Sequence, residues 1–285
     1  MEIKINGQLA DITVEQEKTI ADILSGLYTL LDGSGQYINK IAVDGNAVNS
    51  SSVDEVLSME IEKVKVLEVD TVPVAVVTAL SLEYLLEDIN EFEKTSFEER
   101  TKFFNDWKER SYVNFIFGQM PEFYSFFANA FSQGSISLET LRSITEEWRR
   151  EVKDPAAEGV NIKPILEDVC ARLTDLPLDI QTGKDARAAQ TIQIFTGIGE
   201  KILRIIRQLN IQGYLPETED GEKSFVQITE EFGNVLKELL DAYQRNDTVL
   251  VGDLAEYEVT TRLMELYNII KSCHEQAALQ GKEKK

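Results

Sequence analysis

The side chains best suited to catalysis or metal binding are one histidine, two cysteines and many carboxylates. His274 directly follows Cys273 in a segment with helical patterning. Helix neighbours point about 100° apart, so these two side chains are poorly placed to share one catalytic step. The chain also has too few cysteines and histidines for a structural zinc site. We therefore predict no catalytic residue, no metal site and no cofactor from this set.

Carboxylates gather at Glu217–Glu222, Glu230–Glu231 and Asp253–Glu258. None of these runs has the spacing of a calcium-binding loop, and runs of charge are usually solvated faces. Asp253 and Glu256 are three residues apart and share one face of the expected helix. This pair is the basis of one hypothesis for function, a carboxylate-dependent enzyme.

The segment Thr196–Lys201 contains two glycines and a lysine, a composition that also occurs in phosphate-binding loops. Such a loop follows a strand and opens a helix, whereas this segment lies inside a long helical pattern. We interpret Gly197 and Gly199 as positions of close helix contact or of a kink.

Aromatic side chains are concentrated between Phe103 and Phe131. This pattern is typical of a core between two helices, and also of a protein interface. The aromatic residues of 123–131 cover too much of one short helix to be buried on a single side, so we expect some to be exposed. The partner-binding candidates of this segment are Phe123, Tyr124, Phe127 and Phe131.

Lys201, Arg204 and Arg207 form a basic stripe at intervals of three residues, opposite apolar positions of the same expected helix. Two interpretations stay open. The stripe pairs with acidic neighbours inside the molecule, or it binds an acidic partner. We include all three residues among the partner-binding candidates.

Composition narrows the class of protein. The 285 residues are 43% hydrophobic and 28% charged, which predicts a globular chain with a real core. A net charge of −21 disfavours nucleic acid and anionic membranes, and favours a protein partner with a basic or mixed surface. Self-association is compatible with this composition.

The compartment is predicted from what the sequence contains. The apolar run around Val72–Leu82 is shorter than the roughly 20 residues of a membrane span. The first residues, MEIKINGQLADI, do not have the pattern of a signal peptide, and two cysteines are too few for a disulfide framework. We therefore expect a cytoplasmic protein with no membrane span.

Residues 1–70 predict a small β-domain with one helix. Glu2–Asn6 and Leu9–Val14 alternate apolar and polar residues around an Asn6-Gly7 turn. Thr19 is suited to cap a helix that ends at the glycines near position 33. The remaining expected strands are Tyr37–Val43, which leads into an Asp44-Gly45 turn, a short strand at Ala47-Val48, and Ile61–Val69.

This order of elements over Met1–Val69 resembles the ubiquitin-like, or β-grasp, superfamily. Its conjugating and sulfur-carrier members end in a free Gly-Gly tail after the last strand. Here the chain continues through Asp70–Pro73 into another domain. The resemblance therefore implies a fold and a surface for partners, but no thiocarboxylate or isopeptide chemistry.

Residues 73–280 predict a large all-α domain, and residues 281–285 a polar tail. The first expected helix begins at Pro73. Further helices are expected over about 96–117, 121–132, 137–153, 163–173, 184–212, 224–245 and 249–280. The segment Asn246–Glu258 is similar to one that recurs in uncharacterised helical bacterial proteins, and this resemblance implies a bacterial origin.

The predicted fold class is α+β, a β-grasp domain followed by a helical bundle. Our first hypothesis is a non-catalytic adaptor, scaffold or assembly factor, which predicts an exposed aromatic patch. The second is a binder of an apolar small molecule or lipid, which predicts a cavity lined by Phe104, Phe115, Phe123 and Phe127. The third, the carboxylate-dependent enzyme, predicts a cleft where several carboxylates meet.

Overall fold

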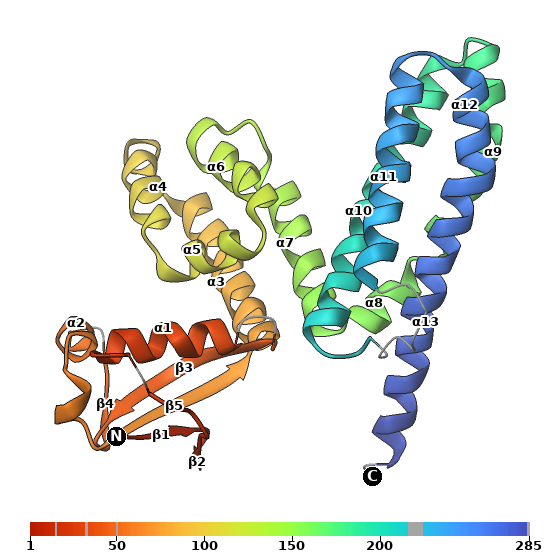
Figure 1. Cartoon of the computed structure of the whole chain (residues 1–285). Helices are drawn as coiled ribbons and strands as arrows, with labels where there is room; N and C mark the ends of the chain where they lie inside the picture. The colour runs from red at the N-terminus through yellow and green to blue at the C-terminus, as the bar shows by residue number, and fades with distance from the viewer. Residues whose placement is uncertain (15, 32–33, 50, 216–224, 284–285) are drawn as a thin grey trace. The chain divides into compact units, whose positions relative to one another are not determined.

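In a computed structural model the chain forms two compact units, Met1–Glu146 and Glu147–Lys285. The structure describes residues 1–14, 16–31, 34–49, 51–215 and 225–283, so the carboxylate run Glu217–Glu222 lies outside the described residues. A mixed sheet at the N-terminus precedes a helical region, which confirms the predicted α+β class (Figure 1). The boundary between the units falls inside one helix, α7 (Leu138–Lys153).

Five strands form the sheet of unit 1. In chain order they are β1 (Glu2–Ile5), β2 (Gln8–Leu9), β3 (Gln36–Val43), β4 (Asn46–Ala47) and β5 (Val66–Pro73). Their order across the sheet is β2-β1-β5-β3-β4. The first and last strands in the chain, β1 and β5, pair in parallel, and the other pairs are antiparallel.

Both predicted hairpin turns are present. Asn6 and Gly7 have φ of 50° and 76°, and Asp44 and Gly45 have φ of 51° and 81°. Positive φ at both central positions is the signature of the tight turn that matches the twist of paired strands. The Asp44 carboxylate also accepts hydrogen bonds from two backbone N–H groups at the start of β5.

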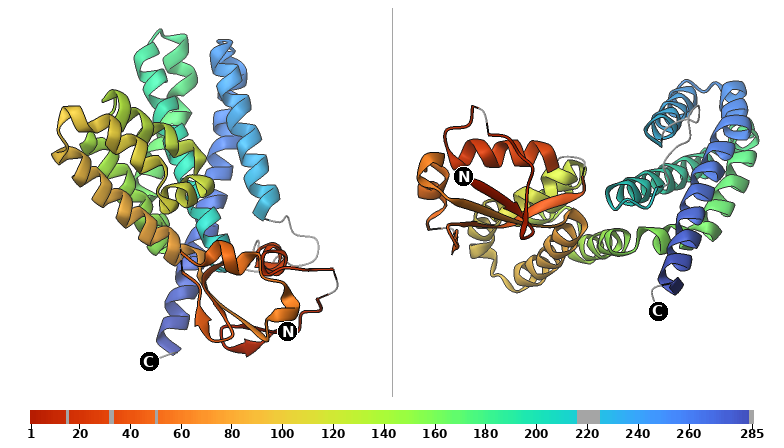
Figure 2. Two further views of the ribbon diagram at one scale, coloured as in Figure 1. Left: turned by 90° about the vertical axis from the view of Figure 1, so that its left-hand side faces the viewer. Right: turned by 60° about the horizontal axis from the view of Figure 1, so that its bottom comes forward.

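One helix, α1 (Ile20–Leu31), lies along one face of the sheet (Figures 1 and 2). Its buried side chains recur at positions 20, 23, 24 and 27, the spacing that the sequence predicted for a single apolar face. They pack against buried residues of the sheet that include Ile3, Ile38, Leu67 and Val69. This core holds the sheet and the helix together.

The rest of unit 1 is helical. Its elements are α2 (Val53–Leu57), η1 (Ile61–Lys63), α3 (Val74–Lys94), η2 (Phe97–Glu99), α4 (Arg100–Lys108), α5 (Ser111–Gln119), η3 (Pro121–Phe123), α6 (Tyr124–Gln133) and the first part of α7. The elements named η1 to η3 are short 3₁₀ turns. Helix α3 follows β5 directly, as the sequence predicted at Pro73.

The single helix expected over 96–117 is two helices. Helix α4 ends at Lys108, and Arg110 has an extended backbone (φ −66°, ψ 131°) before α5 begins at Ser111. Arg110 and Tyr112 from this bend reach the buried Asp88 of α3. A long-range polar contact thus breaks a pattern that is locally helical.

Unit 2 contains the second part of α7 and six further helices within the described residues. These are α8 (Pro155–Asn161), α9 (Lys163–Gln181), α10 (Asp185–Ile211), α11 (Phe225–Gln244), α12 (Thr248–Asp253) and α13 (Thr260–Glu283), with a π-helical turn, η4 (Leu254–Val259), before α13. Their shared core includes Leu173, Phe195, Ile202, Leu263 and Ile270.

Several features of unit 2 differ from the sequence prediction, and one is that the single helix expected over 249–280 is divided into α12, η4 and α13. Asp154-Pro155 ends α7 but also starts α8, because the Asp154 side chain accepts a hydrogen bond from the backbone N–H of Ala157. Helix α9 continues past Leu173 to Gln181 with Pro177 inside it. Helix α13 continues to Glu283, beyond the expected end at Gln280.

No described helix combines the length and the apolar character that crossing a membrane requires.

Candidate functional site

The aromatic segment of unit 1 is organised around Trp107 of α4, which is fully buried. Its ring is nearly parallel to those of Tyr124 and Phe127 of α6, with interplanar angles of 13° and 12°. Phe117 and Phe131 meet the same indole edge-on, with centroids 5.9 and 5.1 Å away. Aromatic pairs in these geometries are stabilising beyond the area they bury. Most of the segment is therefore the core that joins α4, α5 and α6.

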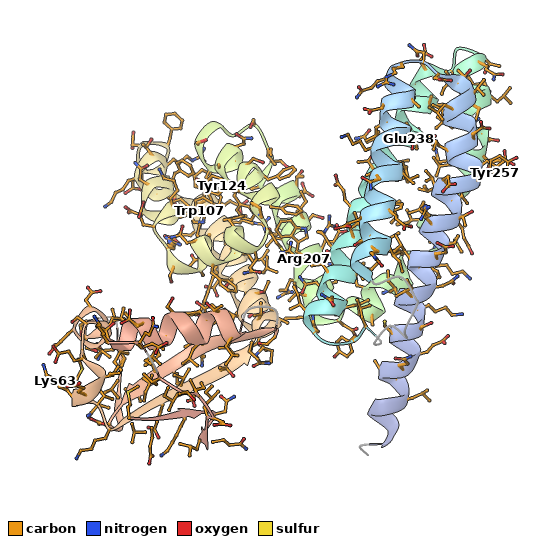
Figure 3. The ribbon with its side chains drawn as sticks, in the orientation of Figure 1. Lys63, Trp107, Tyr124, Arg207, Glu238 and Tyr257 are labelled. Carbon is orange, nitrogen blue, oxygen red and sulfur yellow. The ribbon has the colours of Figure 1, made fainter. Side chains whose placement is uncertain are left out.

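The structure separates the predicted aromatic candidates into two groups. Phe123, Phe127 and Phe131 are buried, so they contribute to the core and offer little surface to a partner. Tyr124 is 38% exposed, and so is Phe126. The expectation that this short helix exposes part of its aromatic surface is confirmed. Figure 3 labels Trp107 and Tyr124 in this part of unit 1.

A buried carboxylate fixes the bend between α4 and α5. Asp88 of α3 accepts hydrogen bonds from the Trp107 indole N–H at 3.0 Å and from the Tyr112 hydroxyl at 2.7 Å. It also forms an ion pair with Arg110. Burial raises the pKa of Asp88, against the opposing effect of these donors. Three donors thus satisfy this buried carboxylate, which gives it a structural role.

A pocket of about 270 Å³ lies beside this core, where the end of α3, η2, α4 and the end of α6 meet. Four aromatic rings line it, from Phe92, Phe97, Phe104 and Phe131. Phe92 and Phe131 are buried, whereas Phe97 is 85% exposed. The pocket therefore combines buried and exposed aromatic rings with the polar side chains of Thr101 and Ser132, a lining suited to binding.

Arg100 is a cation in the lining of this pocket. Its guanidinium carbon lies 5.0 Å from the centre of the Phe92 ring, a cation–π distance. Its Nε is buried and has no hydrogen-bond acceptor. The described side chains also include no ion-pair partner for Arg100. A guanidinium has five N–H donors, so this group has unused capacity to bind an oxyanion.

Lys108 extends the same face of α4. Arg100, Phe104 and Lys108 follow one another at intervals of four residues, the spacing of a single helix face. The Lys108 ammonium lies 4.9 Å from the centre of the Phe104 ring. Like Arg100, it has no ion-pair partner among the side chains that the structure describes. We call Arg100, Phe104 and Lys108 the α4 stripe.

The predicted basic stripe on α10 is arranged differently. Lys201 forms hydrogen-bonded ion pairs with Glu147 of α7 at 2.8 Å and with Glu158 of α8 at 3.0 Å. Arg204 binds both oxygens of Glu151, at 2.9 and 3.0 Å. The Glu151 side chain is only 2% exposed. Of the two interpretations of this stripe, the geometry favours internal pairing for these two residues.

These internal pairs shift the protonation equilibria of both cations. Burial alone lowers the pKa of Lys201, but its hydrogen bonds to Glu147 and Glu158 outweigh burial and raise that pKa. Burial likewise lowers the pKa of Arg204, but the hydrogen bonds and the charge of nearby glutamates, Glu151 first, outweigh burial and raise that pKa. Both side chains therefore stay charged at neutral pH.

Arg207, the third predicted residue of the α10 stripe, is exposed (Figure 3). It has no ion pair with any side chain in the described ranges. The structure thus brings Lys201 and Arg204 into one buried network and leaves Arg207 outside it.

Of the four residues expected to line a ligand cavity, Phe104 lines the observed pocket, whereas Phe123 and the rest are not part of its described lining. Within the described residues no group of three or more His, Cys, Asp or Glu side chains is placed to hold a metal ion.

Sequence reasoning missed Phe97, Arg100 and Lys108. The α4 stripe, with intervals of four residues where the α10 stripe has three, was readable in the sequence as one helix face. What distinguishes the two is the presence of carboxylates from other helices, which only the tertiary structure provides.

Two family descriptions match parts of the chain. Residues 1–73 match the TP0873 N-terminal domain, a range that ends with strand β5. Residues 161–269 match a domain of unknown function, DUF8042, which covers helices from α9 into α13. No curated protein and no solved structure matches the chain.

Proposed function

We propose that this protein is a non-catalytic adaptor or assembly factor that binds another protein at the pocket of unit 1. The observation that carries the proposal is Phe97, a large apolar side chain left 85% exposed beside a pocket with buried aromatic walls. Covering such a ring would stabilise a complex by about 1.5–3 kcal/mol. Exposed aromatic anchors next to pockets are where protein interfaces concentrate their binding energy.

Two further parts of the proposal concern the sheet and the compartment. The strand order, the parallel pairing of β1 with β5 and the single helix on one face support a ubiquitin-like β-grasp domain. The two unpaired cysteines, Cys170 and Cys273, are consistent with a reducing bacterial cytoplasm. The sheet would then be a rigid support for the helices that build the pocket.

Site-specific photo-crosslinking in cells of the source organism tests the adaptor. A benzophenone amino acid replaces Phe97 in one variant and Ile165, an exposed apolar residue of unit 2, in the control. We expect a discrete protein adduct from position 97 and none of the same mass from position 165. The same adducts from both positions, or none from position 97, would contradict a partner at the pocket.

The same pocket is also the candidate site for the second hypothesis, the binding of an apolar small ligand. Its volume of about 270 Å³ lies just below the range of roughly 300–1,000 Å³ that drug-sized ligands occupy. Native mass spectrometry of the purified chain separates the two. A bound small molecule that survives purification would favour the ligand binder over the adaptor.

A further inference from the structure

We propose that the pocket binds an acidic segment of the partner protein, in which a large apolar side chain lies beside carboxylates. This inference rests on the proposed function and adds the chemistry of the partner. The apolar side chain would enter between the aromatic walls. The carboxylates would bind the two cations of the α4 stripe.

The first observation that favours an acidic segment is the charge around the pocket. Arg100 and Lys108 lie on one face of α4 with Phe104 between them, and neither has an ion-pair partner among the described side chains. Lys201 and Arg204 on α10 are instead held by carboxylates. Two cations left without carboxylates in a chain of net charge −21 mark a place where negative charge can be received.

The second observation is the geometry of Arg100. Its guanidinium rests on the Phe92 ring, which limits its motion, and its Nε donor is buried without an acceptor. A buried donor without an acceptor is costly. A carboxylate binds a guanidinium through two parallel hydrogen bonds, and the two terminal nitrogens of Arg100, which are not among the buried unpaired atoms, are the donors that it could reach.

The third observation is the volume of the pocket, which bears on the apolar side chain of the segment. A cavity of about 150 Å³ holds a benzene molecule, and this pocket measures about 270 Å³. It therefore has room for one aromatic or large aliphatic side chain and the carboxylate beside it.

The rest of the surface sharpens the choice of partner. The overall negative charge favours basic partners at the encounter stage. A net negative charge disfavours an acidic segment in general, so such a segment needs local cations like those of the α4 stripe. Repulsion elsewhere would add specificity, because it fixes where the segment binds.

Selection from a display library of random dodecapeptides on the full-length chain tests the inference. We expect enriched peptides to combine Asp or Glu with an aromatic or large aliphatic residue. Their dissociation constants, from fluorescence anisotropy, should rise about tenfold or more in Arg100→Gln, because a hydrogen bond to a charged group is lost. Lys108→Gln should weaken binding less, and Arg100→Lys should retain part of the affinity.

Matched controls separate local from general charge effects. Arg245→Gln and Lys237→Gln make the same charge changes at exposed positions of unit 2, and we expect unchanged affinity. Circular dichroism melts of each variant verify that it is folded. Equal weakening by Arg245→Gln and Arg100→Gln would overturn the inference.

The remaining outcomes distinguish the two proposals. Enriched peptides that are basic and lose binding in Phe97→Ala would overturn the acidic partner but leave the adaptor in place. Failure to enrich any peptide whose binding depends on Phe97 would contradict both the acidic partner and the adaptor. Stoichiometric binding of decanoate that displaces every selected peptide would assign the pocket to a lipid and also overturn the inference.

Discussion

Helices α4 and α10 both carry cations along one face, but the cations of only one helix, α10, form ion pairs with carboxylates of other helices. On α10, Lys201 and Arg204 each bind glutamates from α7 or α8. On α4, Arg100 and Lys108 lie against phenylalanine rings and have no ion-pair partner among the described side chains. Similar sequence patterns therefore serve different purposes, one within the fold and one at a surface.

The difference in ion pairing between the two helices indicates which cations of an acidic protein are candidates for binding a partner. A cation that is paired inside the molecule holds two helices together, and its removal leaves a buried charge behind. A cation without a carboxylate contributes little to the fold and is available to a ligand. Stability and binding measurements should therefore separate α4 from α10.

The largest expected effect is on α10. Arg204→Ala leaves the Glu151 carboxylate, which is 2% exposed, without its guanidinium. Breaking a buried pair costs about 3–5 kcal/mol of the free energy of unfolding when the remaining charge is uncompensated, and because Lys201 still lies 3.8 Å from Glu151 we expect the lower end of this range. Urea denaturation followed by circular dichroism measures it. The control is Arg207→Ala on the same helix, where we expect a change within about 0.5 kcal/mol.

The second expected effect is a dependence on alkaline pH. Lys201 has a pKa raised above its ordinary value of 10.5 in the folded protein. Its stabilising contribution is therefore complete below pH 10.5 and is lost as the pH rises through the folded value. Urea midpoints of the wild type and of Lys201→Met, measured between pH 9 and the alkaline limit of folding, should converge on the alkaline side. Parallel pH profiles would show that Lys201 is not part of the pairing.

A smaller effect is expected on α4. Arg100→Met keeps the apolar stem and removes a guanidinium with a buried, unpaired Nε. The lost cation–π contact, about 0.5–1 kcal/mol, is offset by the removal of the unpaired donor. The free energy of unfolding should change far less than in Arg204→Ala. A loss as large as that of Arg204→Ala would break the comparison between the helices.

The smallest effect on stability is expected at Phe97. Because 85% of this side chain is already exposed, Phe97→Ser should change the free energy of unfolding by no more than about 0.5 kcal/mol. Binding of a selected peptide should nevertheless fall. A thermal melt and an anisotropy titration on the same sample measure both. A clear loss of stability would mean that Phe97 belongs to the core.

Local chemistry made much of the fold predictable. The turns at Asn6-Gly7 and Asp44-Gly45 were predictable because few residues adopt positive φ in tight hairpins. The apolar face of α1 was predictable from its spacing. Each of these features depends on residues that are near one another in the chain.

Features that depend on distant residues were not predictable. Pro177 was expected to lie beyond a helix end, yet α9 passes through it, with the proline ring packed close to Gly252. The bend at Arg110 depends on Asp88, which lies on another helix. The candidate site follows the same rule, because the spacing of Arg100 and Lys108 is visible in the sequence but their missing partners are not.

The parallel pairing of β1 with β5 also bears on how the protein is made. Residues 2–5 are synthesised before their neighbours at 66–69, which belong to the last strand of the sheet in chain order. The hairpin of β1 and β2 therefore waits, with one edge unpaired, until β5 arrives between β1 and β3. At about 5–20 residues per second this delay lasts several seconds. During that interval the nascent chain exposes the strand edge that a chaperone would be expected to cover.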